Sequence, residues 1–418
     1  MKTLSRELLL SRLNLGLDLA VNLQKQLYFD LRRDWVTPLM DSVGFWQGNI
    51  VHAREELLRE SILVDDCLFS DLFNDFWEAK RNLNYEEPVD LYVSNRPDVN
   101  AFSVLSFNQK ERHIIVLHAA LVNALTDKQI QCVIGHELGH LMNDDAELRR
   151  LVCFFYPQEE MCPPILRYKM GLLAQLNELR ADRCGLIACG DLDASILSFL
   201  CMTAGVPQTR FSCDASKFIE RCYQGLELIR THQDSFNNEI HPEVPVRVCA
   251  LEIFSKEPDE QVAADKIQEI LSLLHDTSDD NMKTISVYAL AGWLVANSDA
   301  KINTMELSSI ISNMSSKGDL FPEKLIAKVK TADLNTLLRS LVELLKETNT
   351  PVNDLISYML EIVVADREIN QVELEFVRSF AEMGNLSEEE FAQLLAGTIR
   401  SCYRPILSHR PQEDDLPF

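Results

Sequence analysis

The sequence of 418 residues predicts an α+β protein that is mostly α, with a small β-sheet in its first part and an all-α domain in its second. Three observations support this class. Apolar residues recur at helical spacing through most of the chain, two strand-like runs follow one another after residue 100, and the last third holds an internal helical repeat. The length allows two or three domains, each with a hydrophobic core of its own.

Residues 1–84 are predicted to form a helical region. Its leucines keep helical periodicity, and three phenylalanines suggest a second buried face. Arg6, Glu7, Arg12 and Asp18 interrupt the first leucine-rich stretch, which therefore indicates an amphipathic helix and not a secretory signal. Two interpretations of the region remain, a packing subdomain and a lid over a site in the next domain. Packing is favoured because no chemical group there demands a function.

Residues 85–255 are predicted to form the next domain. A turn at residues 97–100 leads into a strand-like run, Ala101–Phe107, and a second run follows at Glu111–His118. An ordinary hairpin is one interpretation of the two runs. The other is an extended edge that holds a peptide by strand addition, in which backbone hydrogen bonds tolerate any sequence.

A helix is predicted to begin after Thr126 and to stop near Asn143. Gln129 stands at the third helical position, so that it completes a capping box with Thr126. Gly135 and Gly139 are poor helix formers, each less favourable than alanine by about 1 kcal/mol. We therefore expect a second backbone to press closely against this helix.

His136 and His140 stand four residues apart, so both project from one face of this helix and can bind one zinc ion. Glu137 lies beside them, where a base that activates water is needed. The alternative is a core helix with two incidental histidines. A third ligand is expected from a separate helical stretch, in which Glu178 and Asp182 share a face. Glu178 can bind the metal while Asp182 orients a zinc histidine, although such acidic pairs more often form a solvated face.

His241 and Arg247 precede a further amphipathic stretch. They either belong to a surface turn made by two prolines or help to complete the site. In its motifs and their order, the chain resembles the HtpX and CAAX prenyl-protease family of zinc metallopeptidases over roughly residues 85–255. The matching motifs are Asn100-Ala101-Phe102, His136-Glu137-x-x-His140, Glu178-x-x-x-Asp182 and His241-Pro242 with Arg247.

That resemblance implies a zincin-type peptidase domain with one Zn²⁺ per chain, held by His136, His140 and Glu178. It implies Glu137 as the general base and Asp182 as the partner of a zinc ligand. His241 and Arg247 would stabilise the transition state, and Asn100, Ala101 and Phe102 would bind a protein or peptide substrate. Many members of that family are embedded in membranes. This chain departs from them, because it contains no run of eighteen apolar residues and therefore predicts no transmembrane segment.

The remaining chain is predicted to be a linker with a short helix at residues 256–282, a helical domain at 283–405 and a disordered acidic tail at 406–418. Within the helical domain, Asp299–Leu307 recurs as Asp366–Leu374. In each copy an asparagine caps a helix and a glutamate three residues later reaches back, as Asn303 with Glu306 and Asn370 with Glu373. An EF-hand is excluded, because the acidic loop is too short and lacks the central glycine.

The second copy resembles the TerB-like helical domain of tellurite-resistance proteins. This resemblance implies an interaction or regulatory module with a regulatory protein as its partner. Plain helical packing is the alternative, because capping signals of this kind are generic.

Composition indicates which kinds of partner and which cellular compartment are expected. The chain has 64 acidic against 40 basic residues and a net charge of -24, which argues against nucleic acid as a partner. Eleven cysteines, an odd number without regular spacing, favour reduced thiols in a cytoplasm. The sequence therefore predicts a cytoplasmic zinc metalloendopeptidase. Two rivals stay open, a catalytically silent peptidase fold with a binding or chaperone-like role, and a zinc hydrolase of non-peptide amides or esters.

Overall fold

The structure is a computed structural model. It describes residues 3–45, 55–57, 59–106, 111–143, 145–157, 162, 164–212, 214–231, 241–274, 279–317, 322–365 and 368–402. Contacts divide the chain into two compact units, residues 1–162 with 169–275 and residues 276–418 with 163–168. Helices dominate and one small sheet is present, which confirms the predicted class. The predicted tail at residues 406–418 lies outside the described residues.

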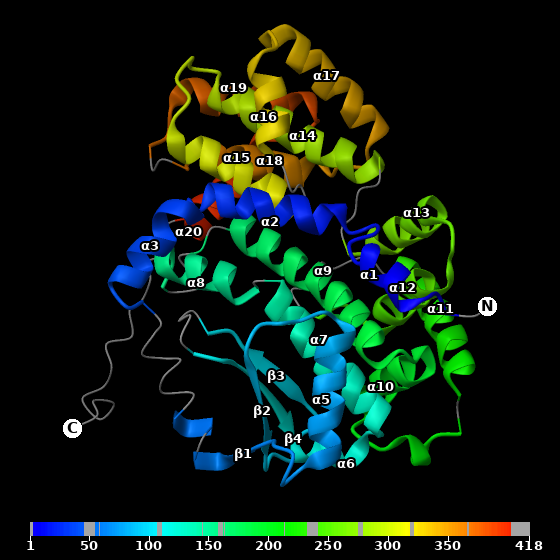
Figure 1. The fold of residues 1–418 in the computed structure, drawn as a ribbon. Coiled ribbons are helices and arrows are strands. Elements are labelled where there is room, and N and C mark those ends of the chain that lie inside the picture. The colour runs from blue at the N-terminus through cyan, green and yellow to red at the C-terminus, as the bar shows by residue number, and fades with distance from the viewer. Residues whose placement is uncertain are drawn as a thin grey trace, which may run out of the picture. The chain divides into compact units, whose positions relative to one another are not determined.

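The sheet of the first unit has four strands in the order β1 (Ser61–Leu63), β2 (Val89–Ser94), β4 (His113–His118) and β3 (Ala101–Val104). The strands β2 and β4 are parallel, whereas β1 with β2 and β3 with β4 are antiparallel. The predicted hairpin of β3 and β4 is therefore confirmed, and β3 lies at an edge of the sheet (Figure 1). The prediction that residues 1–84 are all helical is wrong at β1, because this segment pairs its backbone with β2.

Besides this sheet, twelve α-helices of the first unit are described. They are α1 (Arg6–Ser11), α2 (Asp18–Asp30), α3 (Arg33–Ser42), α5 (Ser70–Asn82), α6 (Ala119–Ala124), α7 (Asp127–Met142), α8 (Asp145–Phe155), α9 (Pro164–Cys189), α10 (Leu192–Ala204), α11 (Ala215–Thr231), α12 (Val244–Lys256) and α13 (Glu260–Leu271). The helix α7 packs against both α5 and α10. None of the described helices is long and apolar enough to cross a membrane.

The helix α7 begins and ends where the sequence predicted. Thr126 and Gln129 form the capping box, and Asn143 is the C-cap. The two glycines face α9, as expected from a close backbone contact. A Cβ atom at Gly135 would lie 2.3 Å from the Cβ of Ala188, and one at Gly139 would lie 2.8 Å from the Cα of Ala181. The helices α7 and α9 therefore approach closely enough for side chains of both to share one centre.

The N-terminal region contacts α7 and α9 outside the pocket described below. The amide of Gln24 donates to the carbonyl of Asn143 at the end of α7, at 2.7 Å. The buried guanidinium of Arg183 on α9 donates to the carbonyls of Leu13 and Leu15, at 2.7 and 2.9 Å. These contacts agree with the packing interpretation of this region.

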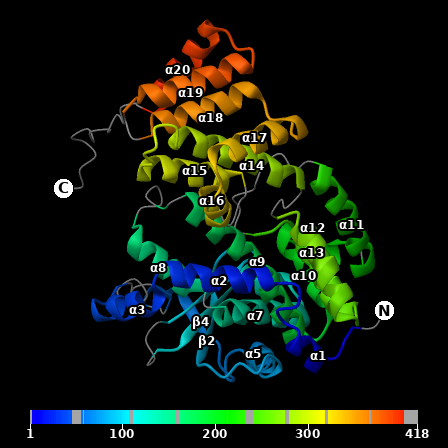
Figure 2. The same cartoon turned by 90° about the horizontal axis from the view of Figure 1, so that it is seen from above.

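The second unit contains α14 (Asp279–Ala296), α15 (Thr304–Ser316), α16 (Pro322–Lys330), α17 (Leu334–Glu347), α18 (Val352–Val363), α19 (Gln371–Met383) and α20 (Glu388–Cys402). Figure 2 shows α18, α19 and α20 lying side by side. Both predicted caps are present, since the Oδ1 atoms of Asn303 and Asn370 accept from the second backbone N–H of their helices at 2.6 and 2.9 Å. The Asn370 amide also donates to Asp299 of the other copy at 2.7 Å, which links the two repeats.

Candidate metal centre

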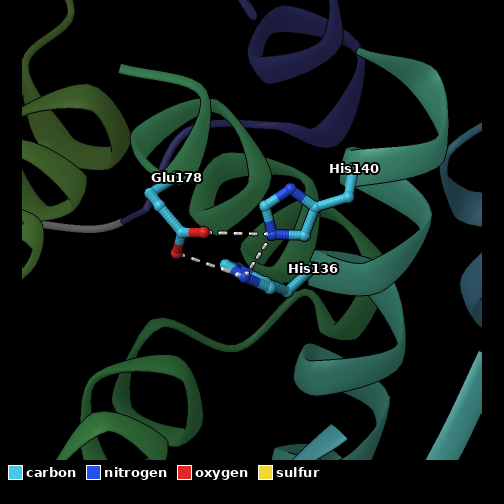
Figure 3. Close-up of side chains that lie close together, drawn as sticks. All are labelled: His136, His140 and Glu178. Atoms are coloured by element: carbon cyan, nitrogen blue, oxygen red, sulfur yellow. Dashed lines mark hydrogen bonds and ion pairs between the residues drawn. The ribbon is translucent and has the colours of Figure 1, made fainter. Parts of the chain in front are cut away.

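Three predicted ligands from two helices converge on one point (Figure 3). The Nε2 atoms of His136 and His140 on α7 lie 3.0 Å apart. On α9, the Glu178 carboxylate places Oε2 3.6 Å from the first of these nitrogens and Oε1 3.3 Å from the second. Within the described part of the chain, these residues form the group of His, Cys, Asp and Glu side chains with the spacing of a metal site, their ligand atoms all within 4.8 Å of one another.

The spacing of these atoms fits a zinc ion. Nitrogen and oxygen ligands bind zinc at about 2.1 Å, so two ligands at a tetrahedral angle lie about 3.4 Å apart. The separations of 3.0, 3.3 and 3.6 Å among His136, His140 and Glu178 bracket that value. Two imidazoles and one carboxylate also form the ligand set of catalytic zinc sites that keep one position open. The donor set and its spacing therefore both suit the metal that the sequence predicted.

Asp182, one turn after Glu178, fixes the orientation of one histidine. Its Oδ1 lies 3.0 Å from the Nδ1 of His136, so that an N–H there donates to the carboxylate and directs the lone pair of Nε2 at the centre. Burial by itself raises the pKa of Asp182, but the adjacent Arg247 guanidinium outweighs it and holds the pKa below the usual value. This aspartate therefore stays ionised although it is only 3% exposed.

Arg247 of α12 binds the same carboxylate from the other side. Its Nε and Nη2 donate to Asp182 at 2.9 and 2.6 Å, and Nη2 also lies 3.3 Å from Glu178. The guanidinium stacks over the ring of Phe199, with 4.8 Å between its central carbon and the ring centroid. A bidentate pair of this kind has a fixed geometry. The guanidinium of Arg247 is thus bound to the two carboxylates that face the histidines.

His241 contacts the centre through Glu178. Its Nδ1 lies 3.0 Å from Oε2 of Glu178, although 66% of the side chain is exposed. The contact with Glu178 raises the pKa of His241. Burial by itself raises the pKa of Glu178, but the contacts with His140, His241 and Arg247 outweigh it and keep the pKa well below the usual value. The predicted His241 and Arg247 therefore join the predicted ligands instead of forming a separate surface turn.

The centre lies in a pocket of about 630 Å³. One wall is β3 with its flanks, from Asn100 to Leu105, which includes all three predicted substrate-binding residues. Glu137 also lines the pocket beside the two histidines and is 7% exposed. The structure thus brings together every residue that the sequence nominated for the site. No described residue of the N-terminal region 1–84 lines the pocket, which counts against the interpretation of that region as a lid.

Two walls were not identified from the sequence. The helix α10 contributes Ser198, Phe199, Met202 and Thr203, and the helix α8 contributes Ala146 and Arg149. The α10 segment has the composition of a buried apolar helix, and such a pattern does not indicate which face meets a pocket. Arg149 gave no signal either, since a single arginine on a helix is most often solvated.

Comparison with known proteins agrees with this geometry. Residues 72–158 match the profile of peptidase family M48, and this segment includes β2, β3, β4 and α7 with its two histidines. The chain is also similar to the plastoglobule-localized metallopeptidase 48, chloroplastic, of Arabidopsis thaliana. The two are 30% identical over 173 residues, which are 40% of this chain and 49% of that protein. The chain thus spans about half the length of this curated relative. No solved structure matches the chain.

Proposed function

We propose that this protein is a zinc-dependent endopeptidase whose catalytic domain lies in the first unit. The observation that carries the proposal is the convergence of His136, His140 and Glu178 within 4.8 Å of one another in a pocket bordered by an edge strand. The match to a metallopeptidase family over residues 72–158 supports the same reaction class. That match ends before Glu178, so the third ligand rests on the geometry of α9.

Zinc bound here would supply a Lewis acid and a water of lowered pKa. Glu137 would accept the proton of that water and then deliver it to the departing amine, because it stands next to His136 in the pocket. The edge strand β3 would hold the substrate backbone in an extended form by strand addition. Because residues 100–105 all line the pocket, the strand offers room on both sides of a scissile bond, which supports an endopeptidase.

The contacts assign different roles to the two predicted stabilisers of the transition state. Arg247 is bonded through two nitrogens to Asp182, so we propose that it positions the ligand set instead of meeting the substrate. His241 is the better candidate to donate to a developing oxyanion, since its side chain is largely exposed beside Glu178. Its raised pKa keeps it a donor over more of the neutral range.

The other parts of the proposal concern compartment and regulation. The nine cysteines whose side chains the structure describes form no disulfide, and most of them are buried, which supports a reducing compartment such as the cytoplasm. The second unit contains the capped repeat that resembles a TerB-like domain, and we propose an interaction or regulatory role for it. Its partner would be another protein.

Replacement of Glu137 by glutamine tests the reaction class. We expect Glu137→Gln to bind zinc as the wild type does but to cleave peptides at least about a hundredfold more slowly, because general-base catalysis contributes about 10² to 10⁴. Zinc content by mass spectrometry and turnover of a peptide library, with and without a chelator, measure both quantities.

The same experiment separates the rivals. A zinc-loaded wild type that cleaves no peptide and hydrolyses simple esters or amides would favour a non-peptide hydrolase. Zinc binding without any turnover would favour a silent, chaperone-like protein. Unchanged peptide turnover by Glu137→Gln would show that another group is the base.

A further inference from the structure

The pocket around the metal centre has an uneven charge distribution. Four of its charged side chains, Glu137, Glu178, Asp182 and Arg247, are buried or half-buried beside the histidines. Arg149 of α8 also lines the pocket but is exposed. No hydrogen bond, ion pair or ring contact among the described residues engages it. In a protein with a net charge of -24, the positive charge of Arg149 is therefore open to a ligand in the pocket.

The fold fixes the face of α8 that carries Arg149. The neighbouring Arg150 is 1% exposed, forms an ion pair with Asp41 of α3 and lies 3.4 Å from Glu147. The hydroxyl of Thr37, also on α3, donates to the other oxygen of Glu147 at 2.7 Å. These contacts hold one face of α8 against α3. Ala146 and Arg149, three residues apart, share another face and line the pocket.

Chain direction places Arg149 at one end of the edge strand. Ala101 of β3 lies opposite Leu117 near the end of β4, whereas Val104 lies opposite Ile114. Figure 1 shows the chain passing from the end of β4 through α6 and returning through α7 toward α8. The end of α7 and the start of α8 therefore lie toward Val104, and the start of α7 lies toward Ala101.

The wall that α10 forms offers apolar side chains and two hydroxyls but no charge. Phe199 and Met202 line it with Ser198 and Thr203, and Val133 of α7, one turn before His136, lines the pocket where α10 packs against α7. Antiparallel pairing is the commoner and slightly more stable arrangement of two strands, and a peptide added in this way to β3 would place its N-terminal residues toward Val104 and Arg149. Its C-terminal residues would face the uncharged wall of α10. The two sides of the scissile bond thus meet surfaces of different chemistry.

We infer that Arg149 is a specificity-determining residue that selects substrates with an aspartate or glutamate on the N-terminal side of the scissile bond. This inference rests on the proposed peptidase function. An arginine side chain pairs with a carboxylate through two N–H groups, and no other group of the described structure competes for it. An apolar residue on the C-terminal side would complete the preferred substrate.

Matched fluorogenic peptides that differ only by glutamate or glutamine test the inference, with the variable residue two or three positions before the cleaved bond. The sequence to be varied comes from a library digest by zinc-loaded wild type. We expect wild type to prefer glutamate by about fivefold in kcat/KM, the factor that corresponds to an exposed ion pair. Arg149→Glu should reverse the preference, Arg149→Gln should abolish it, and added salt should weaken it in wild type.

Arg221 provides the matched control. It is an exposed arginine on α11 that does not line the pocket, and Arg221→Glu makes the same change in charge. This variant should keep the wild-type ratio between the two peptides. A ratio that Arg149→Glu leaves unchanged, or an acidic preference on the C-terminal side, would overturn the inference while the peptidase function stands. If the zinc-loaded wild type cleaves no member of the library, the function and the inference fail together.

Discussion

Glu178 in the first unit and Glu306 in the second are equally buried, each with 3% of its surface exposed, yet their surroundings differ in kind. Glu306 accepts from the backbone N–H of Asn303 at 2.9 Å and so completes the start of α15. Glu178 faces two histidine nitrogens at 3.3 and 3.6 Å, with His241 and Arg247 behind it. Burial of a carboxylate is thus not enough to identify a site. Convergence of its partners on one shared point makes the difference.

The two units also differ in what their cores contain. The core of the second unit is built from apolar side chains of α14 and α18 with their neighbours, such as Trp293 and Met359. The helix α9 of the first unit instead buries Glu178 and Asp182 one turn apart, where both contact histidines of α7. Buried charges lower stability unless they are paired or serve a metal. Their concentration on α9 is what a functional centre predicts and what a packing helix does not.

Replacement of Glu178 and of Glu306 by alanine should show the largest difference between the two glutamates. We expect Glu178→Ala to weaken zinc binding by more than about a hundredfold, because loss of a ligand exceeds the 10- to 100-fold effect of losing an outer partner. Glu306→Ala should bind zinc as the wild type does and should lower the free energy of unfolding by about 1 kcal/mol, as loss of a helix cap does. Zinc titration and thermal unfolding of both variants measure these effects. Equal zinc affinity in the two variants would remove Glu178 from the ligand set.

The contact of α7 with α9 offers a second test, with a glycine on each helix. A Cβ at Gly135 would meet Ala188 at 2.3 Å and the carbonyl oxygen of Cys184 at 2.9 Å, whereas a Cβ at Gly171 of α9 would meet nothing within 4 Å. We expect Gly135→Ala to destabilise the protein by about 1–3 kcal/mol, because the two helices must separate. It should also weaken zinc binding, since the ligands sit on both helices.

Gly171→Ala is the control for helix propensity. Alanine in a helix interior should stabilise the protein by about 0.5–1 kcal/mol, because the unfolded chain loses conformational freedom. Chemical denaturation of both variants gives the two changes. A Gly135→Ala variant as stable as Gly171→Ala would mean that α7 and α9 are less tightly packed than the structure shows.

Much of the metal centre could be predicted because helical periodicity carries its geometry. The four-residue spacings of His136 with His140 and of Glu178 with Asp182 place each pair on one helix face before any fold is known. The capping box at Thr126 fixes where α7 begins, and Gly135 with Gly139 predicts that another backbone, that of α9, packs closely against it. These signals are local in the sequence, so a reader of the sequence can find them.

The features that were missed depend on contacts between distant segments. The strand β2 joins the sheet through parallel pairing with β4, and β1 joins through pairing with β2, which no local pattern specifies. The commitment of Arg247 to Asp182, 65 residues away, likewise could not be predicted from its position beside two prolines. The same holds for Arg149, because its place in the pocket follows from the way α3 holds α8.

Asp75 is a third kind of carboxylate, and its replacement should give the smallest change in stability. Asp75 of α5 is half-buried, and burial together with the negative charge of Asp127 raises its pKa to about 6, above the usual 3.8. With a folded pKa above the unfolded one, its ionisation destabilises the fold as pH rises from about 4 to 6, and the loss is complete above that range. Asp75→Asn should therefore raise stability by a few tenths to about 1 kcal/mol at pH 7.5, after allowance for solvent screening. The gain should shrink as the pH falls below the usual 3.8 and should vanish near about pH 3, where the wild-type carboxyl is largely protonated in both states. Unfolding curves of the wild type and of Asp75→Asn at the two pH values measure this gain. A gain that is the same at both pH values would mean that packing, and not charge, distinguishes Asp75 from the buried carboxylates that have partners.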